Sequence, residues 1–191
     1  MNSKSITKSQ NHLRELCQIG VFTAVIAVMA QISIPMPSNV PFTLQTFAIA
    51  LAGVVLGPRN GAACATLYVL LAAIGVPVLA GFSGGLGMVF GVTGGFILSF
   101  PLLALGAGLG ARSGKVIGTV AGVTSGVIVN YLCGMIMYSF LTKSSLATAF
   151  IACVLPFILP DILKVIAVIL VGKKLRSALM KSGVLKPWTL I

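Results

Sequence analysis

The sequence predicts an all-α membrane protein with six transmembrane helices and both termini in the cytoplasm, and two observations carry this prediction. First, 58% of the 191 residues are hydrophobic and only 8% are charged, whereas a soluble domain carries about 25% charged residues. Second, the basic residues gather in every second gap between the apolar segments. By the positive-inside rule, those gaps face the cytoplasm.

Six apolar segments are candidates for the spanning helices. A span needs about 20 residues, and the second and third segments are shorter, since fifteen helical residues reach only about 22 Å. Pro35 closes the first segment. The predicted helices are Leu16–Ile34, Thr43–Gly57, Gly61–Gly75, Gly94–Gly110, Val116–Leu141 and Ala147–Gly172.

The charges set the expected orientation of these helices. The chain has thirteen Lys and Arg residues against two acidic residues, and only Lys143 falls on the outer side while only Lys164 falls within a span. We therefore expect a cytoplasmic segment at 1–15, a six-helix membrane domain at 16–172 and a basic cytoplasmic tail at 173–191. The residues that define the cytoplasmic side are Lys4, Lys8, Arg14, Arg59, Arg112, Lys115, Lys173, Lys174, Arg176, Lys181 and Lys186.

Two outer loops have unusual compositions. Residues 35–42 contain three prolines, which makes that loop stiff in φ and poor in backbone donors. Residues 76–95 contain seven glycines and no charge. This second stretch is too rich in glycine for a stable helix and too apolar for a free loop. We expect it to lie over the helices and cap a cavity; a flexible connector is the alternative.

The sixth predicted helix carries two opposite charges inside the membrane. Asp161 is the only acidic residue in any span, and Lys164 follows it on the same helical face. Each charge costs at least about 2.5–3.5 kcal/mol near the bilayer centre. Because intramembrane ionisable residues are functional by default, we interpret the pair as part of a binding site; an ion pair that only pins helix packing is the alternative. Pro156 and Pro160 lie nearby, where we expect the helix to kink or start afresh.

Other polar side chains are expected at a similar depth. Counted from the nearest cytoplasmic charge, Asp161, Asn130, Gln45 and Tyr68 lie about 14–22 Å above that side. The rest of each helix towards the cytoplasm is apolar, whereas a channel carries polar residues along its full length. The pattern predicts a pocket that opens outward above a closed floor, with Thr43 and Thr46 beside Gln45 at its outer end. A single polar residue such as Asn130 or Gln45 more often forms an interhelical hydrogen bond than part of a binding site.

The sequence also excludes several functions. The only histidine, His12, lies in the polar N-terminal segment, so neither a Ser–His protease nor a metal site fits the membrane. No nucleotide-binding motif is present, and the aromatics do not interleave with the basic residues as in nucleic-acid-binding proteins. The single cysteines, without a CxxC pair, are expected to be small buried hydrophobes. We predict no enzyme activity, no cofactor and no metal. These cysteines are Cys17, Cys64, Cys133 and Cys153.

Small residues mark one side of the first predicted helix. Gly20 and Ala24 are four residues apart, and Ala27 and Ala30 continue the series. Such faces allow helices to approach closely in membranes. The partner helix could belong to this chain or to another protein.

Several motifs together resemble the BioY family, the biotin-binding membrane subunits, or S components, of energy-coupling factor transporters. In matching order over roughly 16–172, they are VPFTLQTFAIALAGVVLGPRNG (40–61), Tyr68, GVPVLAGFSGGLG (75–87), TGG (93–95) and PFILPDILK (156–164). Val92 departs from the pattern, because the family often has proline before TGG. This difference affects the loop rather than the polar residues.

The resemblance implies a function and its partners. It implies a six-helix S-component fold in a bacterial cell membrane that captures biotin from outside. It further implies coupling to a transmembrane scaffold protein and two cytosolic ATPases, although some BioY proteins are reported to work without dedicated partners. The small-residue face at Gly20 and Ala24 is similar to the scaffold-docking surface of S components. Asp161, Lys164 and Asn130 would address the ureido ring of biotin.

The chemistry of biotin matches these residue types. The ureido ring has two N–H donors and one carbonyl acceptor, which Asp161, Lys164 and Asn130 can satisfy. Glycine N–H groups of the loop could bind the valerate carboxylate as an anion nest. The remaining candidates for the site are Thr43 and Gln45 on the wall, Phe42, Tyr68 and Phe82 around the apolar part, and Gly84 and Gly85 in the loop.

Three alternatives remain at this point. An S component for another vitamin is the first; a cationic ligand such as thiamine would favour more aromatic or acidic lining than one intramembrane carboxylate. A passive facilitator is the second, and it predicts solute flux without ATPase partners. A purely structural scaffold is the third, and it leaves the cost of the two buried charges unexplained.

Overall fold

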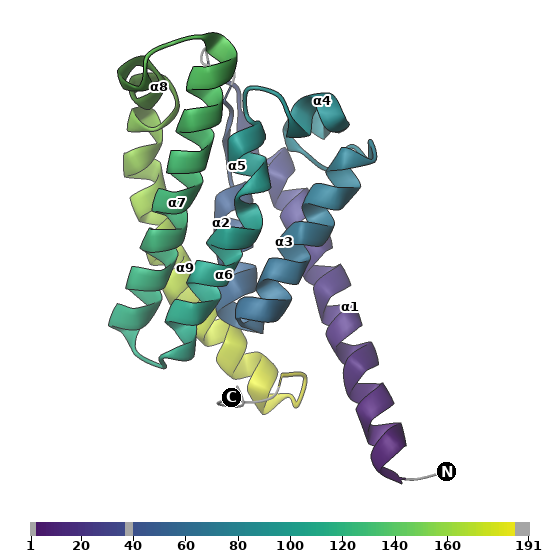
Figure 1. Ribbon diagram of the computed structural model, residues 1–191. Coiled ribbons are helices and arrows are strands. Elements are labelled where there is room, and N and C mark those ends of the chain that lie inside the picture. The colour runs from purple at the N-terminus through teal and green to yellow at the C-terminus, as the bar shows by residue number, and fades with distance from the viewer. Residues whose placement is uncertain (1–2, 37–39, 186–191) are drawn as a thin grey trace.

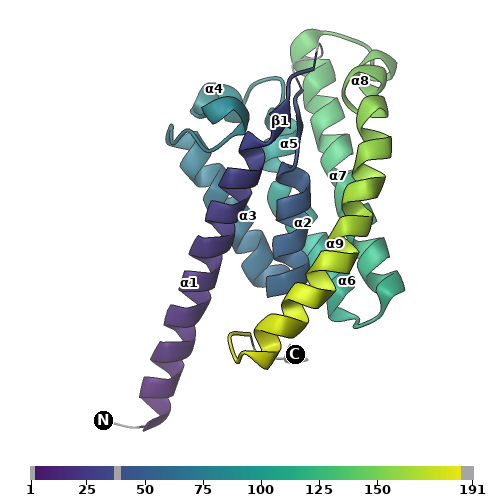
Figure 2. The same ribbon diagram turned by 180° about the vertical axis from the view of Figure 1, so that it is seen from behind.

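A short apolar helix, α2 (Gln45–Leu56), lies at the centre of the fold, where ten of its twelve residues are buried. The computed structural model describes residues 3–36 and 40–185. Because α2 is apolar on all sides, it is stable only when other helices surround it. Those helices, seen from two sides in Figures 1 and 2, are α1 (Ser3–Gln31), α3 (Pro58–Ala73), α6 (Phe100–Arg112), α7 (Val116–Thr142) and α9 (Leu155–Lys181).

Short elements connect these helices. β1 (Ser33–Ile34) pairs antiparallel with β2 (Phe42–Thr43), a hairpin that the sequence did not predict. The glycine-rich stretch contains η1 (Ala80–Phe82) and α4 (Leu86–Val89), and α5 (Gly94–Leu98) and α8 (Leu146–Cys153) precede α6 and α9. The hairpin, η1, α4 and α8 lie at one end of the bundle, which we call the loop end (Figure 1).

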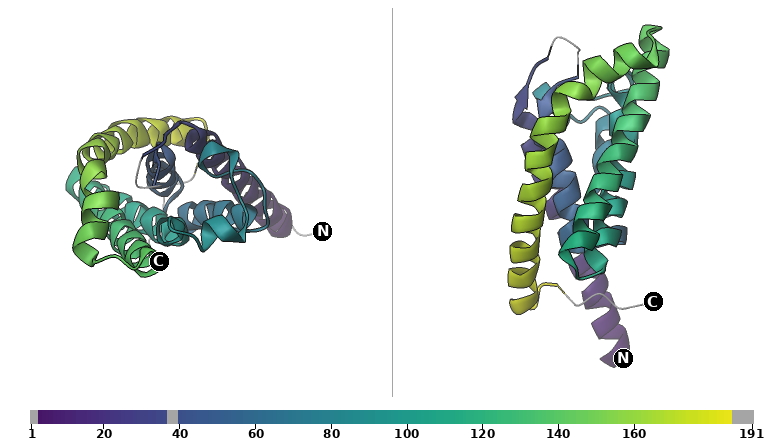
Figure 3. Two further views of the ribbon diagram at one scale, coloured as in Figure 1. Left: turned by 90° about the horizontal axis from the view of Figure 1, so that it is seen from above. Right: turned by 90° about the vertical axis from the view of Figure 1, so that its left-hand side faces the viewer.

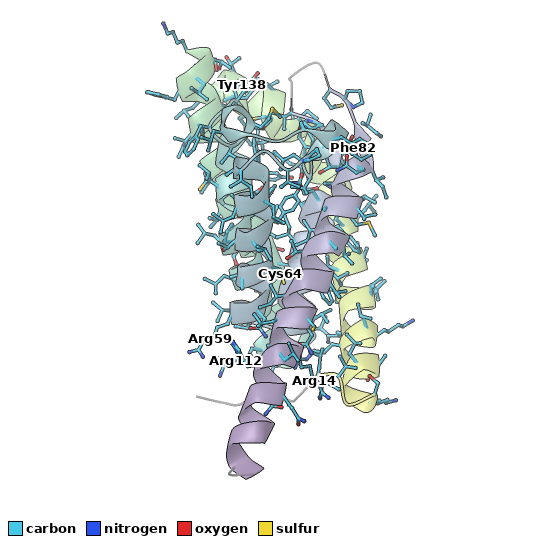
Figure 4. The ribbon with its side chains drawn as sticks, turned by 90° about the vertical axis from the view of Figure 1, so that its right-hand side faces the viewer. Arg14, Arg59, Cys64, Phe82, Arg112 and Tyr138 are labelled. Carbon is cyan, nitrogen blue, oxygen red and sulfur yellow. The ribbon has the colours of Figure 1, made fainter. Side chains whose placement is uncertain are left out.

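Charge is segregated to the other end of the bundle. Arg14, Arg59 and Arg112 lie together there, far from Phe82 and Tyr138 at the loop end (Figure 4). We call this the basic end. The grouping follows from the predicted alternation of charged and uncharged connections, whereas the side of the membrane that each end faces stays a prediction. Lys186 and residues 37–39 of the proline-rich loop lie outside the described residues.

Two predicted spans are interrupted. The fourth divides at Ser99 into α5 and α6, because Pro101 has no N–H to continue the helical bonding. The sixth divides at Val154 into α8 and α9, with Pro156 in the first turn of α9, a position that tolerates proline. The new start at Pro156 agrees with the prediction, but Pro160 lies inside α9 without ending it.

Two helices extend beyond their predicted ends into polar residues. α1 begins at Ser3 and α9 continues to Lys181, since neither flank contains proline or glycine close to the span except the packed Gly172. Hydropathy locates the apolar part of a helix and not its polar extension. Within residues 3–36 and 40–185, three helices are long and apolar enough to span a membrane: Gln10–Gln31, α7 and α9. The count of six crossings remains a prediction.

Glycines set the closest helix contacts. α6 and α7 pack so tightly that a Cβ at Gly110 would lie 2.3 Å from the Gly118 carbonyl oxygen, and one at Gly122 would lie 2.4 Å from that of Gly106. Small residues permit this approach in membranes. The pairing of α7 with α6, and of α9 with α2, determines which helices enclose the site described next.

Candidate functional site

A cavity of about 110 Å³ lies among α2, α7, α9 and the glycine-rich loop. The loop contributes Leu79, Ala80 and Ser83 to the wall, as expected of a capping loop. Most of the polar residues singled out from the sequence meet here. The polar side chains of α2, α7, α9 and the strand before α2 that line the cavity are Thr43, Gln45, Thr46, Asn130, Tyr131, Asp161 and Lys164.

Asp161 is the buried acid of this wall. Its side chain is almost inaccessible, with the residue 6% exposed. Oδ2 accepts a 2.5 Å hydrogen bond from the Tyr131 hydroxyl, and Oδ1 lies 2.7 Å from Lys164 Nζ. The Oδ1 contact lacks hydrogen-bond geometry, so among the described residues Oδ1 is the only buried side-chain oxygen or nitrogen without a hydrogen-bond partner. Buried acceptors are normally satisfied, so this oxygen has capacity for a ligand donor.

Lys164 is held on three sides. Besides the ion pair with Asp161, Nζ donates to Thr46 Oγ1 over 3.1 Å and lies 4.3 Å from the centroid of the Phe42 ring, a distance at which a cation is attracted to the aromatic face. The residue is 9% exposed, so its ammonium group is largely enclosed by protein. The partners of the pair, and the cavity beside it, argue against a self-contained ion pair.

Asn130 has a narrower role than the sequence allowed. Its Nδ2 group donates to the Phe96 carbonyl and to Ser99 Oγ, each over 2.8 Å. These bonds tie α7 to the break between α5 and α6. Both N–H donors of the amide are therefore used, and only its carbonyl oxygen can serve a ligand, as an acceptor.

Gln45 and Tyr68 form a relay to the loop. Gln45 Nε2 donates to the Tyr68 hydroxyl over 2.6 Å, and that hydroxyl donates to the Val78 carbonyl over 2.9 Å. Gln45 lines the cavity, whereas Tyr68 is fully buried behind it. Thr43 lines the cavity and accepts from the Gln45 backbone N–H at the start of α2. Tyr68 thus supports the wall and does not face the cavity.

Four other predicted site residues, Phe42, Phe82, Gly84 and Gly85, lie outside the cavity lining. Phe82 was expected to enclose a ligand, but it is 73% exposed and has left-handed backbone (φ 54°) at the loop end (Figure 4). Gly84 and Gly85 shape the turn: a Cβ at Gly84 would lie 2.4 Å from the Val76 carbonyl, and the Gly85 N–H donates to the Ala72 carbonyl. The loop residues that line the cavity are instead Leu79, Ala80, Ser83, Met88 and Thr93, and the ligand contacts expected of Phe82, Gly84 and Gly85 stay predictions. Phe42 stacks on the lining residue Phe157, with ring centroids 6.4 Å apart.

Gln31, at the end of α1, holds the loop from behind. Its Nε2 donates to the carbonyls of Val78 (3.3 Å) and Leu79 (3.1 Å), and its Oε1 accepts from the Phe82 backbone N–H over 2.9 Å. The last bond stabilises the left-handed conformation of Phe82, which a residue with a side chain rarely adopts. We call these three bonds the Gln31 latch.

Sequence reasoning missed Tyr131 as a partner of Asp161, and it missed Gln31 and Ser99. A tyrosine beside Asn130 was visible in the sequence, but adjacent helical residues point in different directions, so its contact with α9 could not be inferred. Gln31 sits at a helix end, where polar residues are expected. The aromatic wall formed by Phe96, Phe100 and Phe157 had no pattern that separated it from ordinary apolar spans.

The predicted docking face on α1 is only partly free. Gly20 and Ala24 are exposed, and nothing lies within 4 Å of a Cβ built on Gly20. Ala30, in contrast, is fully buried in the core. The exposed residues Gly20 and Ala24 therefore lie in the middle of α1, on the side of its midpoint towards the loop end.

Comparison with known proteins shows the family of this chain. The sequence model described as the BioY family matches residues 1–181. The chain belongs to the BioY family. This BioY chain is 41% identical to a probable biotin transporter BioY of Pyrococcus horikoshii over 164 residues, which cover 86% of the chain and 97% of the relative. It is 35% identical to the biotin transporter BioY of Thermotoga maritima over 169 residues, with coverage of 86% and 97%.

A solved structure supports the same assignment of fold. The BioY chain superposes with a TM-score of 0.79 on the crystal structure of the S-component for biotin from an ECF-type ABC transporter. The two chains are 29% identical, and the match covers 93% of this chain and 95% of the other. The S-component fold that the sequence motifs implied is confirmed at this level.

Proposed function

We propose that this chain is a membrane-embedded biotin-binding subunit that captures biotin for uptake driven by an energy-coupling module. The single observation that carries the proposal is Asp161 Oδ1, a buried carboxylate oxygen in a cavity wall with no hydrogen bond of its own. A carboxylate beside an ammonium group suits a neutral ligand that presents donors and an acceptor together. The biotin-transporter names of its relatives support this ligand.

The ureido ring of biotin fits the three polar groups in one orientation. Asp161 Oδ1 accepts one ring N–H, and the Asn130 carbonyl oxygen accepts the other. Lys164 donates its remaining N–H to the ring carbonyl, since its other contacts are to Asp161 and Thr46. A site of this kind rejects analogues that leave one buried group unpaired. The apolar thiophane then lies against Phe96, Phe100 and Phe157.

The cavity must open to admit this ligand. Its volume of about 110 Å³ is below the roughly 300–1,000 Å³ of typical ligand sites. The glycine-rich loop is fastened to α1 and α3 by the side-chain hydrogen bonds of the Gln31 latch and the Tyr68 relay, which can open without displacing a helix. Loop movement at these bonds is therefore the step that makes room, and the latch retains the ligand afterwards.

We expect Gln31→Leu to speed biotin dissociation about tenfold, because it removes three hydrogen bonds of about 0.5–1.5 kcal/mol each, part of which water replaces in the open loop. Release of radiolabelled biotin from purified protein measures the rate. Gln18→Leu is the matched control: Gln18 lies on the same helix but donates to the Val184 carbonyl at the basic end. Equal dissociation rates for the two variants would show that the latch does not hold the ligand.

The coupling module is proposed to dock on the exposed small residues of α1. We expect Ala24→Leu to reduce co-purification with the transmembrane scaffold protein at least tenfold while biotin binding stays unchanged, since the larger side chain blocks close helix approach. Ala147→Leu makes the same change at an exposed position of α8. If both variants lose the scaffold equally, or neither does, the docking face lies elsewhere.

A binding assay tests the function itself. Purified protein should retain radiolabelled biotin, and unlabelled biotin should displace it while thiamine and riboflavin should not. Displacement by another vitamin at lower concentration would reassign the substrate. Biotin uptake into liposomes that contain this chain alone would favour a facilitator, because the proposal requires ATPases for transport.

A further inference from the structure

A second, larger cavity lies on the outer face of the bundle between α7 and α9. It is a groove of about 600 Å³. Figure 3 (right) looks onto this side, with α7 and α9 flanking it and α8 joining them at the loop end. The groove exists because α7 packs mainly on α6 and α9 mainly on α2, so the two flanking helices meet each other only weakly.

The lining of the groove is suited to hydrocarbon. All of its residues are apolar except Thr124, Tyr131 and Asp161. Both flanking helices are long and apolar enough to cross a membrane, and the rim continues into exposed apolar side chains such as Ile128 and Ile162. From Val120 to Met135 the groove follows α7 for about 22 Å, most of the roughly 30 Å depth of a hydrocarbon core.

Positive charge flanks one end of the groove. Val120 and Ile169 line it nearest the basic end. Lys173 follows Ile169 by four residues and so lies on the same helical face, while Lys115 directly precedes α7. Both lysines therefore lie at the basic end of the flanking helices, at the level where the headgroup of a lipid seated in the groove would lie. Each lysine near a membrane surface raises the affinity for anionic lipid about fivefold.

The substrate cavity and the groove share a wall. Tyr131 and Asp161 line both, and their 2.5 Å hydrogen bond closes the space between α7 and α9 at this level. An empty groove would leave this bond facing loose lipid, whereas an ordered acyl chain packs against it through many small dispersion contacts.

We propose that the α7–α9 groove is a binding site for one anionic phospholipid. Its acyl chain fills the groove behind the Tyr131–Asp161 bond, and its phosphate lies between Lys115 and Lys173. The site belongs to the membrane face of the fold, so it is independent of the nature of the transported substrate.

Native mass spectrometry of detergent-purified protein tests the proposal, with phosphatidylglycerol and phosphatidylcholine as the two probes. We expect one tightly retained phosphatidylglycerol and at least tenfold less phosphatidylcholine. Ile166→Trp fills the groove from a half-exposed position and should remove the retained lipid. Leu163→Trp is the control on the same helix, since Leu163 is exposed but does not line the groove.

A second pair of variants tests the headgroup contact separately. Lys115→Gln with Lys173→Gln should lower phosphatidylglycerol retention at least tenfold, while Lys174→Gln with Lys181→Gln changes net charge equally and should not. Equal retention in all variants would mean that only the general lipid layer is bound and would overturn the proposal. A dimer that Ile166→Trp converts to monomer, without loss of lipid, would overturn it in favour of a second copy of the chain.

Discussion

Asp161→Asn should weaken biotin binding roughly ten- to hundredfold. The substitution keeps the size of the side chain but removes the negative charge that strengthens the hydrogen bond to the ureido N–H, and such charged hydrogen bonds contribute about 1.5–3 kcal/mol. Equilibrium binding of radiolabelled biotin to purified variant protein measures the effect. Elution as a single species from a sizing column shows that the variant is folded.

Glu15→Gln is the control for this change. Glu15 is the other acidic residue of the chain and lies exposed on α1, away from the cavity. Its replacement removes the same charge and should leave affinity unchanged. An Asp161→Asn protein that binds biotin as tightly as the unaltered one would refute the role of the carboxylate and, with it, the proposed orientation of the ligand.

Lys164→Met should produce the largest loss of stability. It leaves the buried Asp161 with Tyr131 as its only described side-chain partner. Removing one member of a buried ion pair costs about 3–5 kcal/mol, because the remaining charge is uncompensated. For a chain of this size we expect the thermal unfolding midpoint in detergent to fall by about 10 °C, together with loss of biotin binding.

The double variant Asp161→Asn with Lys164→Met separates the two roles of the pair. Without either charge, the desolvation cost disappears, so most of the thermal stability should return. Biotin binding should not return, since neither the acceptor charge nor the ammonium donor is present. If the double variant is as unstable as Lys164→Met alone, the destabilisation arises from lost packing of the lysine chain instead.

Much of the fold could be predicted because the membrane imposes it. Every backbone group in hydrocarbon must be satisfied internally, so long apolar segments such as α7 can hardly be anything but helices, and its predicted and observed limits differ by one residue at one end. The helix breaks at Ser99 and Val154 were harder to predict from the sequence. Each depends on how carbonyls freed near a proline find other partners, as Phe96 does with Asn130, and those partners come from elsewhere in the fold.

The candidate site divides in the same way. Asp161 and Lys164 were predictable because a charged side chain inside a membrane is energetically costly and usually has a functional role. The structure places both on the cavity wall. The loop residues were not, because glycine leaves so many backbone paths open that the orientation of Phe82 could not be inferred. Gln31 acts through three backbone groups of the loop, and backbone partners leave no trace in side-chain patterns.

The small volume of the substrate cavity has a kinetic consequence. Since the closed protein has no room for the ligand, an encounter at the surface succeeds only during the interval in which the loop is displaced. The observed rate of capture should then rise with biotin concentration and level off at the frequency of loop displacement. At low biotin concentration, uptake would be limited by the rate at which biotin collides with the protein. At high biotin concentration, it would be limited by the rate of loop displacement.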